Sequence, residues 1–238
     1  MTRIRSALIA DLRVALLALL LLVAWEVSGG DLVLIRLVGG PQGFPLRDGF
    51  LVSHLLHDGG RWLAGIVLTL QVLDLARPIV AGPSRRERGM ALGLTLAGLL
   101  LVPALKRFSV TSCPWDTLEF GGVAAYVPHW LPGVADGGPG HCFPSGHAVS
   151  AFAFFSLYFL WRAHRPGWAR GALYAVLAFG AMFGAAQMVR GAHYVSHTLW
   201  SAWFCWTLTL VLAAAGLRGQ PVRSPSLRRT GCSGLRNS

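Results

Sequence analysis

Apolar runs that approach the length needed to cross a membrane alternate with polar segments along most of the chain. A transmembrane helix needs about 20 predominantly apolar residues, with some tolerance for shorter stretches. We interpret six segments as spans, which lie roughly at 7–27, 61–75, 90–105, 147–161, 171–189 and 197–217. The pattern predicts an all-α fold, an integral membrane bundle of six transmembrane helices.

The polar segments between and after these spans predict the domain organisation. The longest internal one, 108–143, contains several aromatic residues, which are typical of membrane interfaces. The segment after the last span is basic and poor in hydrophobic residues, which is typical of disorder. We expect one six-helix membrane domain at 1–217, with its motif-bearing core at 89–217, and a disordered tail at 218–238.

Composition and charge agree with a membrane protein and predict its orientation. Charged residues make up 13% of the chain, whereas a soluble domain has about 25%. The formal charge of +11 would suit nucleic acid, but the arginines cluster at the ends of apolar runs, so we expect no nucleic-acid partner. Lys and Arg favour cytoplasmic loops. The arginine-rich segments at 77–88 and 162–170 therefore predict cytoplasmic termini in a bacterial-type inner (plasma) membrane.

Three polar groups then fall on the opposite side, facing the periplasm or outside. Lys106 ends the third span, the PSGH turn at 144–147 opens the fourth, and Arg190 and His193 end the fifth. Charged groups near membrane depth usually mark function. We expect the turn to begin a membrane-length helix whose first turn contains His147 and whose N-terminus attracts phosphate. We also expect Arg190 and His193 to share one helix face.

This set of residues suits phosphoryl transfer without a metal or cofactor. One histidine can attack phosphorus while the other protonates the leaving oxygen. Cations and backbone N–H groups can hold the phosphate oxygens. Taken alone, Lys106 could be a snorkelling lysine at a helix end, and His147 an ordinary first-turn histidine. Their placement on one side of the membrane favours the catalytic interpretation.

Three motifs resemble those of the type 2 phosphatidic acid phosphatase superfamily. They are PSGH at 144–147, Lys106 upstream of Pro114, and GAHYVS at 191–196. The family's motifs read KxxxxxxRP, PSGH and SRxxxxxHxxxD on a six-helix membrane core. The resemblance is close over about 106–217, while earlier residues match only as membrane spans. It implies a metal-independent lipid phosphatase that forms a phosphohistidine.

The resemblance also implies a role for individual residues. His193 would be the nucleophile, and His147 the general acid for the leaving alcohol. Lys106, the Ser145 hydroxyl and the Gly146 backbone N–H would bind phosphate.

Three positions depart from the family pattern. Cys113 and Gln187 stand where the family has its two arginines, and His197 stands where it has Asp. We expect Arg190, with Arg107 as a further candidate, to replace the missing arginines.

The group that would orient His193 is left open by the sequence. His197 can accept a hydrogen bond from it only while neutral, which makes it a weaker orienting group than Asp. Asp116 or Asp136 from the outer loop could serve instead.

Cys113 and Cys142 flank the long outer loop and border the first two motifs. In an oxidising compartment, a disulfide between them would clamp the loop over the site. The alternative is a pair of unlinked thiols.

The sequence therefore predicts a phosphoric ester or anhydride hydrolase that acts on a membrane lipid phosphate. Candidate substrates are phosphatidic acid, phosphatidylglycerophosphate, undecaprenyl pyrophosphate and the lipid A phosphates, which the sequence does not separate. One alternative is a phosphotransferase of the same family. Another is a catalytically inactive lipid-binding protein, which the missing arginines keep open. The sequence does not determine the oligomeric state.

Overall fold

The computed structural model describes residues 2–131 and 133–218, so all of the expected tail at 218–238 except its first residue lies outside the described residues. Within the described residues the regular structure is helical and contains no β-strand, which confirms the all-α prediction. The helices are α1 Thr2–Val27, α2 Gly30–Ile35, η1 Leu51–Leu56, α3 His57–Ala76, α4 Arg85–Arg107, η2 Pro114–Asp116, η3 Leu118–Phe120, α5 Val149–Phe152, α6 Phe155–Trp161, α7 Pro166–Val189 and α8 Val195–Arg218.

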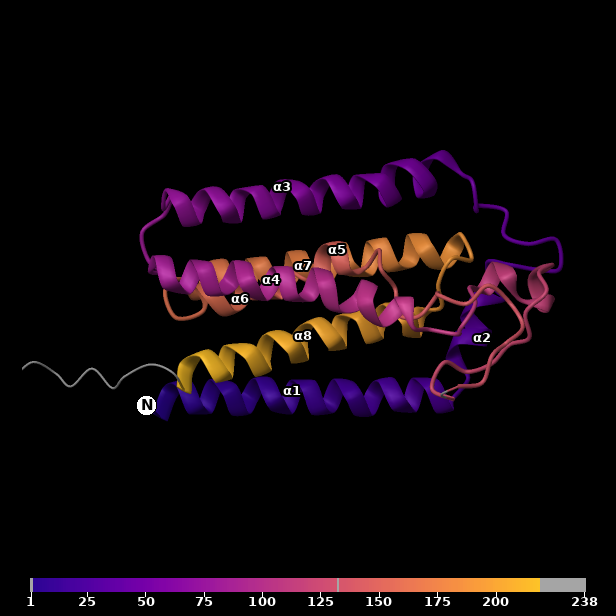
Figure 1. The fold of residues 1–238 in the computed structure, drawn as a ribbon, viewed down its shortest axis with the longest axis horizontal. Helices are drawn as coiled ribbons and strands as arrows, with labels where there is room; N and C mark the ends of the chain where they lie inside the picture. Colours follow the sequence, from indigo (N-terminus) through magenta and orange to yellow (C-terminus); the bar gives the residue numbers. More distant parts are fainter. Residues whose placement is uncertain (1, 132, 219–238) are drawn as a thin grey trace, which may run out of the picture.

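The long helices lie side by side along one common direction (Figure 1). α8 packs against α1, α4 and α7, and α6 packs against α4 and α7. The segments 28–56 and 108–143 gather at one end of the bundle, which we call the loop end. The tight turns 77–84 and 162–165 lie at the opposite end. Every predicted phosphate-site residue therefore belongs to a segment that reaches the loop end.

Fewer helices are long and apolar enough to cross a membrane than the six that the sequence pattern predicts. Among the described residues, four helices are long and apolar enough to cross a membrane: Ser6–Val27, Arg85–Arg107, Pro166–Val189 and Val195–Ala215. α3 occupies the place of the expected second span, but it carries Asp58, Arg61 and Asp74. These four helices indicate a multi-pass membrane protein, and the count of six stays a prediction.

The expected fourth span differs most from its prediction. It is a 13-residue apolar stretch, Val149–Trp161, and it is divided into α5 and α6 by a turn at Ala153 and Phe154. His147 lies before α5 in a turn, not inside the first turn of a long helix. His147 therefore precedes the helix instead of lying in its first turn, and phosphate binding at this helix start stays a prediction.

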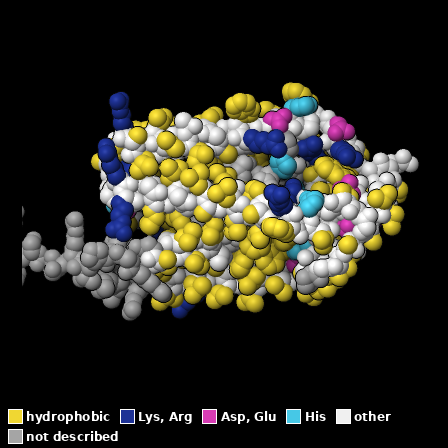
Figure 2. All heavy atoms as spheres, in the orientation of Figure 1, with side chains coloured by type: hydrophobic (Ala, Val, Ile, Leu, Met, Phe, Trp, Pro, Cys, Tyr) yellow, Lys and Arg dark blue, Asp and Glu magenta, His cyan; other side chains and the backbone are white. Residues whose placement is uncertain are grey.

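Charged side chains are distributed unequally between the two ends of the bundle (Figure 2). Apolar side chains cover much of the middle, as expected for a surface that faces lipid. At the loop end, histidines and acidic residues lie among the Lys and Arg side chains, whereas the opposite end of this face shows Lys and Arg. This asymmetry matches the charge pattern from which the orientation was predicted.

Candidate active site

The candidate site forms where three segments meet at the loop end of the bundle. These segments are the end of α4, the PSGH turn and the short connection from α7 to α8. A Cβ added at Gly146 would lie 3.9 Å from Cδ of Lys106, so this side chain runs past the turn. The rings of His147 and His193 lie with their centroids 6.0 Å apart. The structure thus brings together the lysine and both histidines that the sequence placed on one side.

The connection between α7 and α8 is shaped by a glycine. α7 ends at Val189, Arg190 is its C-cap, and Gly191 has a φ of 74°. The amide of Gly191 donates to the carbonyl of Met188, and that of Ala192 donates to the carbonyl of Gln187. These bonds form a Schellman motif, which reverses the chain at a helix end. Arg190 and His193 therefore do not share a helix face, which corrects the sequence interpretation.

His193 is enclosed by the residues that the chain reversal brings around it. Its side chain is buried, with 1% of the residue exposed. Nδ1 lies 3.4 Å from Nδ1 of His197 and 3.5 Å from Sγ of Cys142. A disulfide sulfur carries no hydrogen and can only accept. Both contacts are satisfied when Nδ1 of His193 carries the hydrogen, which leaves the Nε2 lone pair available.

The charge state of His193 follows from this environment. Burial is the main cause that lowers the pKa of His193 well below its ordinary value, because an imidazolium ion is poorly solvated there. The positive charges that His197, Lys106 and His147 can carry lower the pKa further. The ring is therefore neutral at neutral pH, which is the nucleophilic form of histidine.

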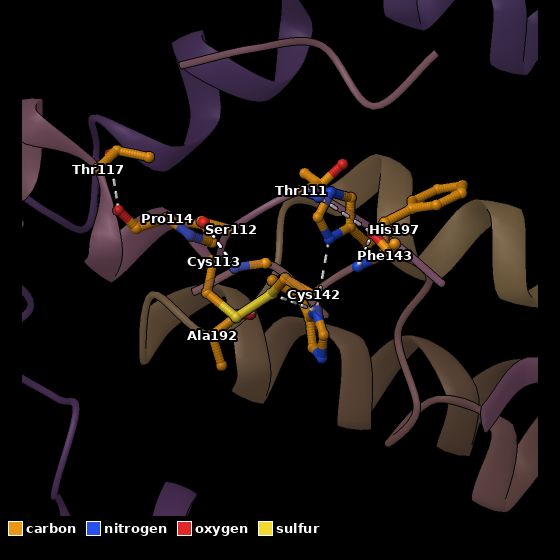
Figure 3. Close-up of a disulfide and its surroundings, with 12 residues drawn as sticks. Thr111, Ser112, Cys113, Pro114, Thr117, Cys142, Phe143, Ala192 and His197 are labelled. Atoms are coloured by element: carbon orange, nitrogen blue, oxygen red, sulfur yellow. Dashed lines mark hydrogen bonds between the residues drawn. A yellow bond between two sulfur atoms is a disulfide. The ribbon is translucent and has the colours of Figure 1, made fainter. Parts of the chain in front are cut away.

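Cys113 and Cys142 form a disulfide whose Cα atoms are 5.1 Å apart. Figure 3 shows the bond beside Ala192 and His197, so it joins the two ends of the outer loop next to the α7–α8 connection. Sγ of Cys142 lies 2.9 Å from the carbonyl oxygen of Ala192, a close contact in which no hydrogen is shared because the sulfur has none.

The Cys113–Cys142 disulfide also decides whether Cys142 can act as a metal ligand together with His193 and His197. One ligand atom each from Cys142, His193 and His197 lies within 4.8 Å of the others, a spacing that would suit a transition metal. The metal ligand would have to be a thiolate, and the Cys142 sulfur is bonded to Cys113. In its oxidised form the chain therefore does not offer this three-residue ligand set.

The Ser145 hydroxyl is fully buried and has no hydrogen-bond partner among the described residues. The backbone around it is fixed, because its amide donates to the carbonyl of His197 at 3.1 Å and its carbonyl accepts from the Ser201 hydroxyl at 2.9 Å. A buried polar atom without a partner is uncommon. The hydroxyl therefore has unused hydrogen-bonding capacity inside the site.

The two positions without the family's arginines have different surroundings. Gln187 is buried, and its Oε1 lies 3.5 Å from Nη1 of Arg190. The other side of that guanidinium is held at the surface, where Nε donates to the carbonyl of Arg47 at 2.8 Å. Arg190 thus lies beside Gln187, the residue that stands where the family's third motif has its arginine. Cys113 stands at the position of the other family arginine, and its sulfur is bonded to Cys142. Arg107, the further candidate, is exposed at the end of α4.

The two aspartates considered for orienting His193 stabilise the outer loop. The carboxylate of Asp136 accepts from the amide of Ser112 at 2.5 Å, from its hydroxyl at 2.8 Å and from the amide of Gly138 at 3.0 Å. The carbonyl of Asp116 accepts from the amides of Val123 and Ala124. The group found against Nδ1 of His193 is His197.

Sequence reasoning missed two buried ionisable residues beside the site, Glu26 and His129. Nε2 of His129 lies 3.1 Å from Oε1 of Glu26, and their side chains are 5% and 8% exposed. The ring of His129 lies perpendicular to that of His197, with centroids 5.5 Å apart. An acidic residue at the end of an apolar span was an available signal for Glu26, since such residues are costly in membranes and often functional.

A family model described as the PAP2 superfamily matches residues 88–218. The match begins at the start of α4 and ends with α8, so it contains every predicted catalytic and phosphate-binding residue. No curated protein and no solved structure matches the chain.

Proposed function

Because the chain belongs to the PAP2 superfamily, we propose that it is a membrane phosphatase that hydrolyses a lipid phosphomonoester or pyrophosphate. The family indicates phosphatase or phosphotransferase chemistry on phosphate esters. The observation that supports hydrolysis at this site most strongly is the neutral, buried His193 facing His147 at a centroid distance of 6.0 Å.

The proposed reaction has two in-line displacements. Nε2 of His193 attacks phosphorus, a P–N bond forms, and the P–O bond to the lipid breaks. His147 gives its proton to the leaving oxygen, so the lipid leaves as a neutral alcohol or as a lipid phosphate. In the second step His147 takes a proton from water, the water oxygen attacks phosphorus, and the P–N bond breaks to release phosphate and free His193.

The phosphate oxygens would be held by groups from all three segments. Lys106 supplies a positive charge, while the Ser145 hydroxyl and the Gly146 backbone N–H supply hydrogen bonds. Preorganised donors of this kind stabilise the charge of a phosphoryl transition state. Arg190, beside Gln187, supplies the second cation in place of the missing arginines. These residues provide the charge stabilisation for which other phosphatases use a metal ion, so we expect metal-independent activity.

The substrate is a lipid because the site lies at one end of a bundle with lipid-facing helices. We place this end at the outer leaflet or periplasmic side of a bacterial-type inner membrane, with the termini in the cytoplasm and six spans in total. This placement is supported by the arginine-rich turns at the opposite end. Phosphatidic acid, phosphatidylglycerophosphate, undecaprenyl pyrophosphate and lipid A phosphates are the substrates to test.

The deciding experiment measures phosphate release from this lipid panel by the full chain in detergent micelles. We expect His193→Ala to lower kcat by about 10³-fold or more, because the covalent route is lost. His54→Ala is the matched control, because His54 is an exposed histidine paired with Asp58 at the same end of the molecule. EDTA should leave the rate unchanged, and vanadate should inhibit it. Equal rates for wild type and His193→Ala on every lipid would contradict the proposal.

Hydrolase and phosphotransferase differ only in the acceptor of the second step. A labelled phosphate donor presented with a second lipid alcohol separates them by product analysis. We expect labelled inorganic phosphate. Transfer of the label to the second lipid would show a transferase.

A further inference from the structure

The atoms around the disulfide sulfur of Cys142 have the spacing of a metal site. Nδ1 of His193 lies 3.4 Å from Nδ1 of His197 and 3.5 Å from Sγ of Cys142. A tetrahedral zinc ion, bound at about 2.0–2.1 Å by nitrogen and at about 2.3 Å by sulfur, places neighbouring ligand atoms about 3.3–3.6 Å apart. Both distances match that spacing, and one ligand atom from each of the three residues lies within 4.8 Å of the others.

The position of Cys142 does not depend on the disulfide alone. Its amide donates to the carbonyl of Thr111 at 2.9 Å, and the amide of His141 donates to the carbonyl of Ser109 at 2.8 Å. Cys142 is also fully buried. These hydrogen bonds belong to the backbone and do not involve the sulfur, so breaking the disulfide leaves them in place. We expect Sγ of Cys142 to stay beside His193 when the S–S bond is broken.

We propose that reduction of the Cys113–Cys142 disulfide creates a Zn²⁺ site from Sγ of Cys142, Nδ1 of His193 and one nitrogen of His197, and that the bound ion withdraws His193 from catalysis. The metal-binding part of this proposal stands on the geometry of the three residues. The inhibitory part rests on the proposed function, because it concerns the nucleophile.

The reaction that opens the site is a thiol–disulfide exchange. A dithiol gives two electrons and two hydrogens to the S–S bond, which breaks into two thiols while the dithiol becomes a cyclic disulfide. Zn²⁺ then binds Sγ of Cys142 as a thiolate, and the thiol proton passes to water. On His193 the hydrogen moves from Nδ1 to Nε2, because Nδ1 gives its lone pair to the ion.

The surroundings suit a divalent ion held by one thiolate. Lys106 faces both histidines and repels a cation, but the thiolate brings a negative charge that offsets this repulsion. The three ligand residues are buried, which limits competition from bulk water. Three protein ligands leave the fourth position of the ion for a water molecule or a phosphate oxygen.

The bound ion removes the atom proposed to attack phosphorus. Nε2 of His193 is nucleophilic only while it has a lone pair, and in the metal-bound ring this atom carries the hydrogen. The reduced, zinc-bound chain is therefore inactive. The disulfide protects the oxidised chain from this inhibition, because it keeps the sulfur of Cys142 from acting as a ligand.

The test of binding uses Co²⁺ as a coloured substitute for Zn²⁺ with the full chain in micelles. Cys113→Ser leaves Cys142 as a thiol without any reductant. With this variant we expect the thiolate-to-cobalt charge-transfer band, the visible bands of a tetrahedral ion, and loss of both when Zn²⁺ displaces Co²⁺. Metal analysis after dialysis should find one zinc ion per chain. Oxidised wild type should show no thiolate band, and should gain it after treatment with a dithiol that is then removed under nitrogen.

Cys113→Ser/Cys142→Ser is the matched control, because it lacks the same disulfide but also lacks the sulfur ligand. Cys205 and Cys232 remain in both variants, so their contribution cancels. The double variant should show no thiolate band and should bind Zn²⁺ at least about 100-fold more weakly, since even an outer-shell partner of a metal ligand contributes up to that factor. Equal binding by the two variants would overturn the site, as would the absence of the band in both folded Cys113→Ser and reduced wild type.

Phosphate release then tests the inhibition separately. Zn²⁺ should lower the rate of Cys113→Ser in proportion to the ion bound, and EDTA should restore it. The oxidised wild type and the double variant should keep their rates when Zn²⁺ is added. Full activity of zinc-loaded Cys113→Ser would overturn the inhibitory role. If wild type is no faster than His193→Ala, the proposed function fails, while the cobalt spectra still decide whether the metal site exists.

Discussion

At the scale of single residues, the site differs from its family pattern in cations and in the orienting acid. Arg190 is the described cation closest to a missing arginine, because its guanidinium contacts Gln187. The Nε of Arg190 donates to the carbonyl of Arg47, a neutral acceptor that fixes the side chain but does not neutralise its positive charge. The guanidinium can therefore keep its position while it attracts a phosphate.

Replacing Arg190 tests this assignment directly. Arg190→Ala should lower kcat/KM roughly 10- to 100-fold, the loss seen when one charge-stabilising donor is removed. Arg190→Lys should recover part of the activity, because the charge remains. Arg36→Ala serves as the control, since Arg36 pairs with Glu119 on the exposed surface. Full activity of Arg190→Ala in micelles would exclude this role.

At the scale of elements, the α7–α8 connection decides where His193, the proposed nucleophile, lies. The left-handed residue Gly191 ends α7 and turns the chain, so that His193 is directed into the bundle. A Cβ at this position would come within 2.2 Å of the Phe44 ring. Asp31 holds the far side of the turn, because its carboxylate accepts from the amide and hydroxyl of Ser196 at the start of α8.

A single methyl group at Gly191 should therefore displace His193. For Gly191→Ala we expect a backbone cost of about 1–2 kcal/mol from the left-handed conformation, plus the clash with Phe44, and nearly complete loss of activity. Gly137→Ala is the control, because Gly137 has a φ of 80° but no atom within 4 Å of the added Cβ. It should show a smaller drop in melting temperature and keep its activity. Similar losses in both variants would show that the Phe44 contact is unimportant.

At the scale of the whole molecule, the outer loop is joined to the helices around the site. The Cys113–Cys142 disulfide closes the loop over a sequence separation of 29. Trp115 donates from its amide to the carbonyl of Gly191, and Arg36 of the 28–56 segment pairs with Glu119. The two long loop segments thus form one cap over the α7–α8 connection.

This cap predicts a redox state that can be measured. Alkylation of the protein in membranes without reductant should leave Cys113 and Cys142 unlabelled in mass spectrometry. Reduction should lower the stability by about 2–4 kcal/mol, the usual contribution of a disulfide. A Cys113→Ser/Cys142→Ser variant should show the same loss without reductant. Labelling of both cysteines in the untreated sample would contradict the prediction and its oxidising compartment.

Local patterns in the sequence determined the helical class and led to the proposed residues of the phosphate site. Apolar run length depends only on neighbouring residues, so α1, α4, α7 and α8 agree closely with their predicted positions. From the charge pattern we predicted that Lys106, His147 and His193 lie at the same end of the bundle, and the structure places them there. The family pattern was readable as well, since its motifs are short and contiguous, and the match over 88–218 confirms it.

The tertiary structure alone decided what surrounds these residues. The turn between α5 and α6 lies inside a continuous apolar run that gave no sign of it, and the reversal at Gly191 removes the shared face of Arg190 and His193. The contact of Glu26 with His129 joins residues that are far apart in sequence. Such contacts arise from packing between segments, which no local period or motif encodes. The sequence by itself thus predicted His193 as the nucleophile, and only the packing of α1, the outer loop and α8 revealed the ionisable groups beside it.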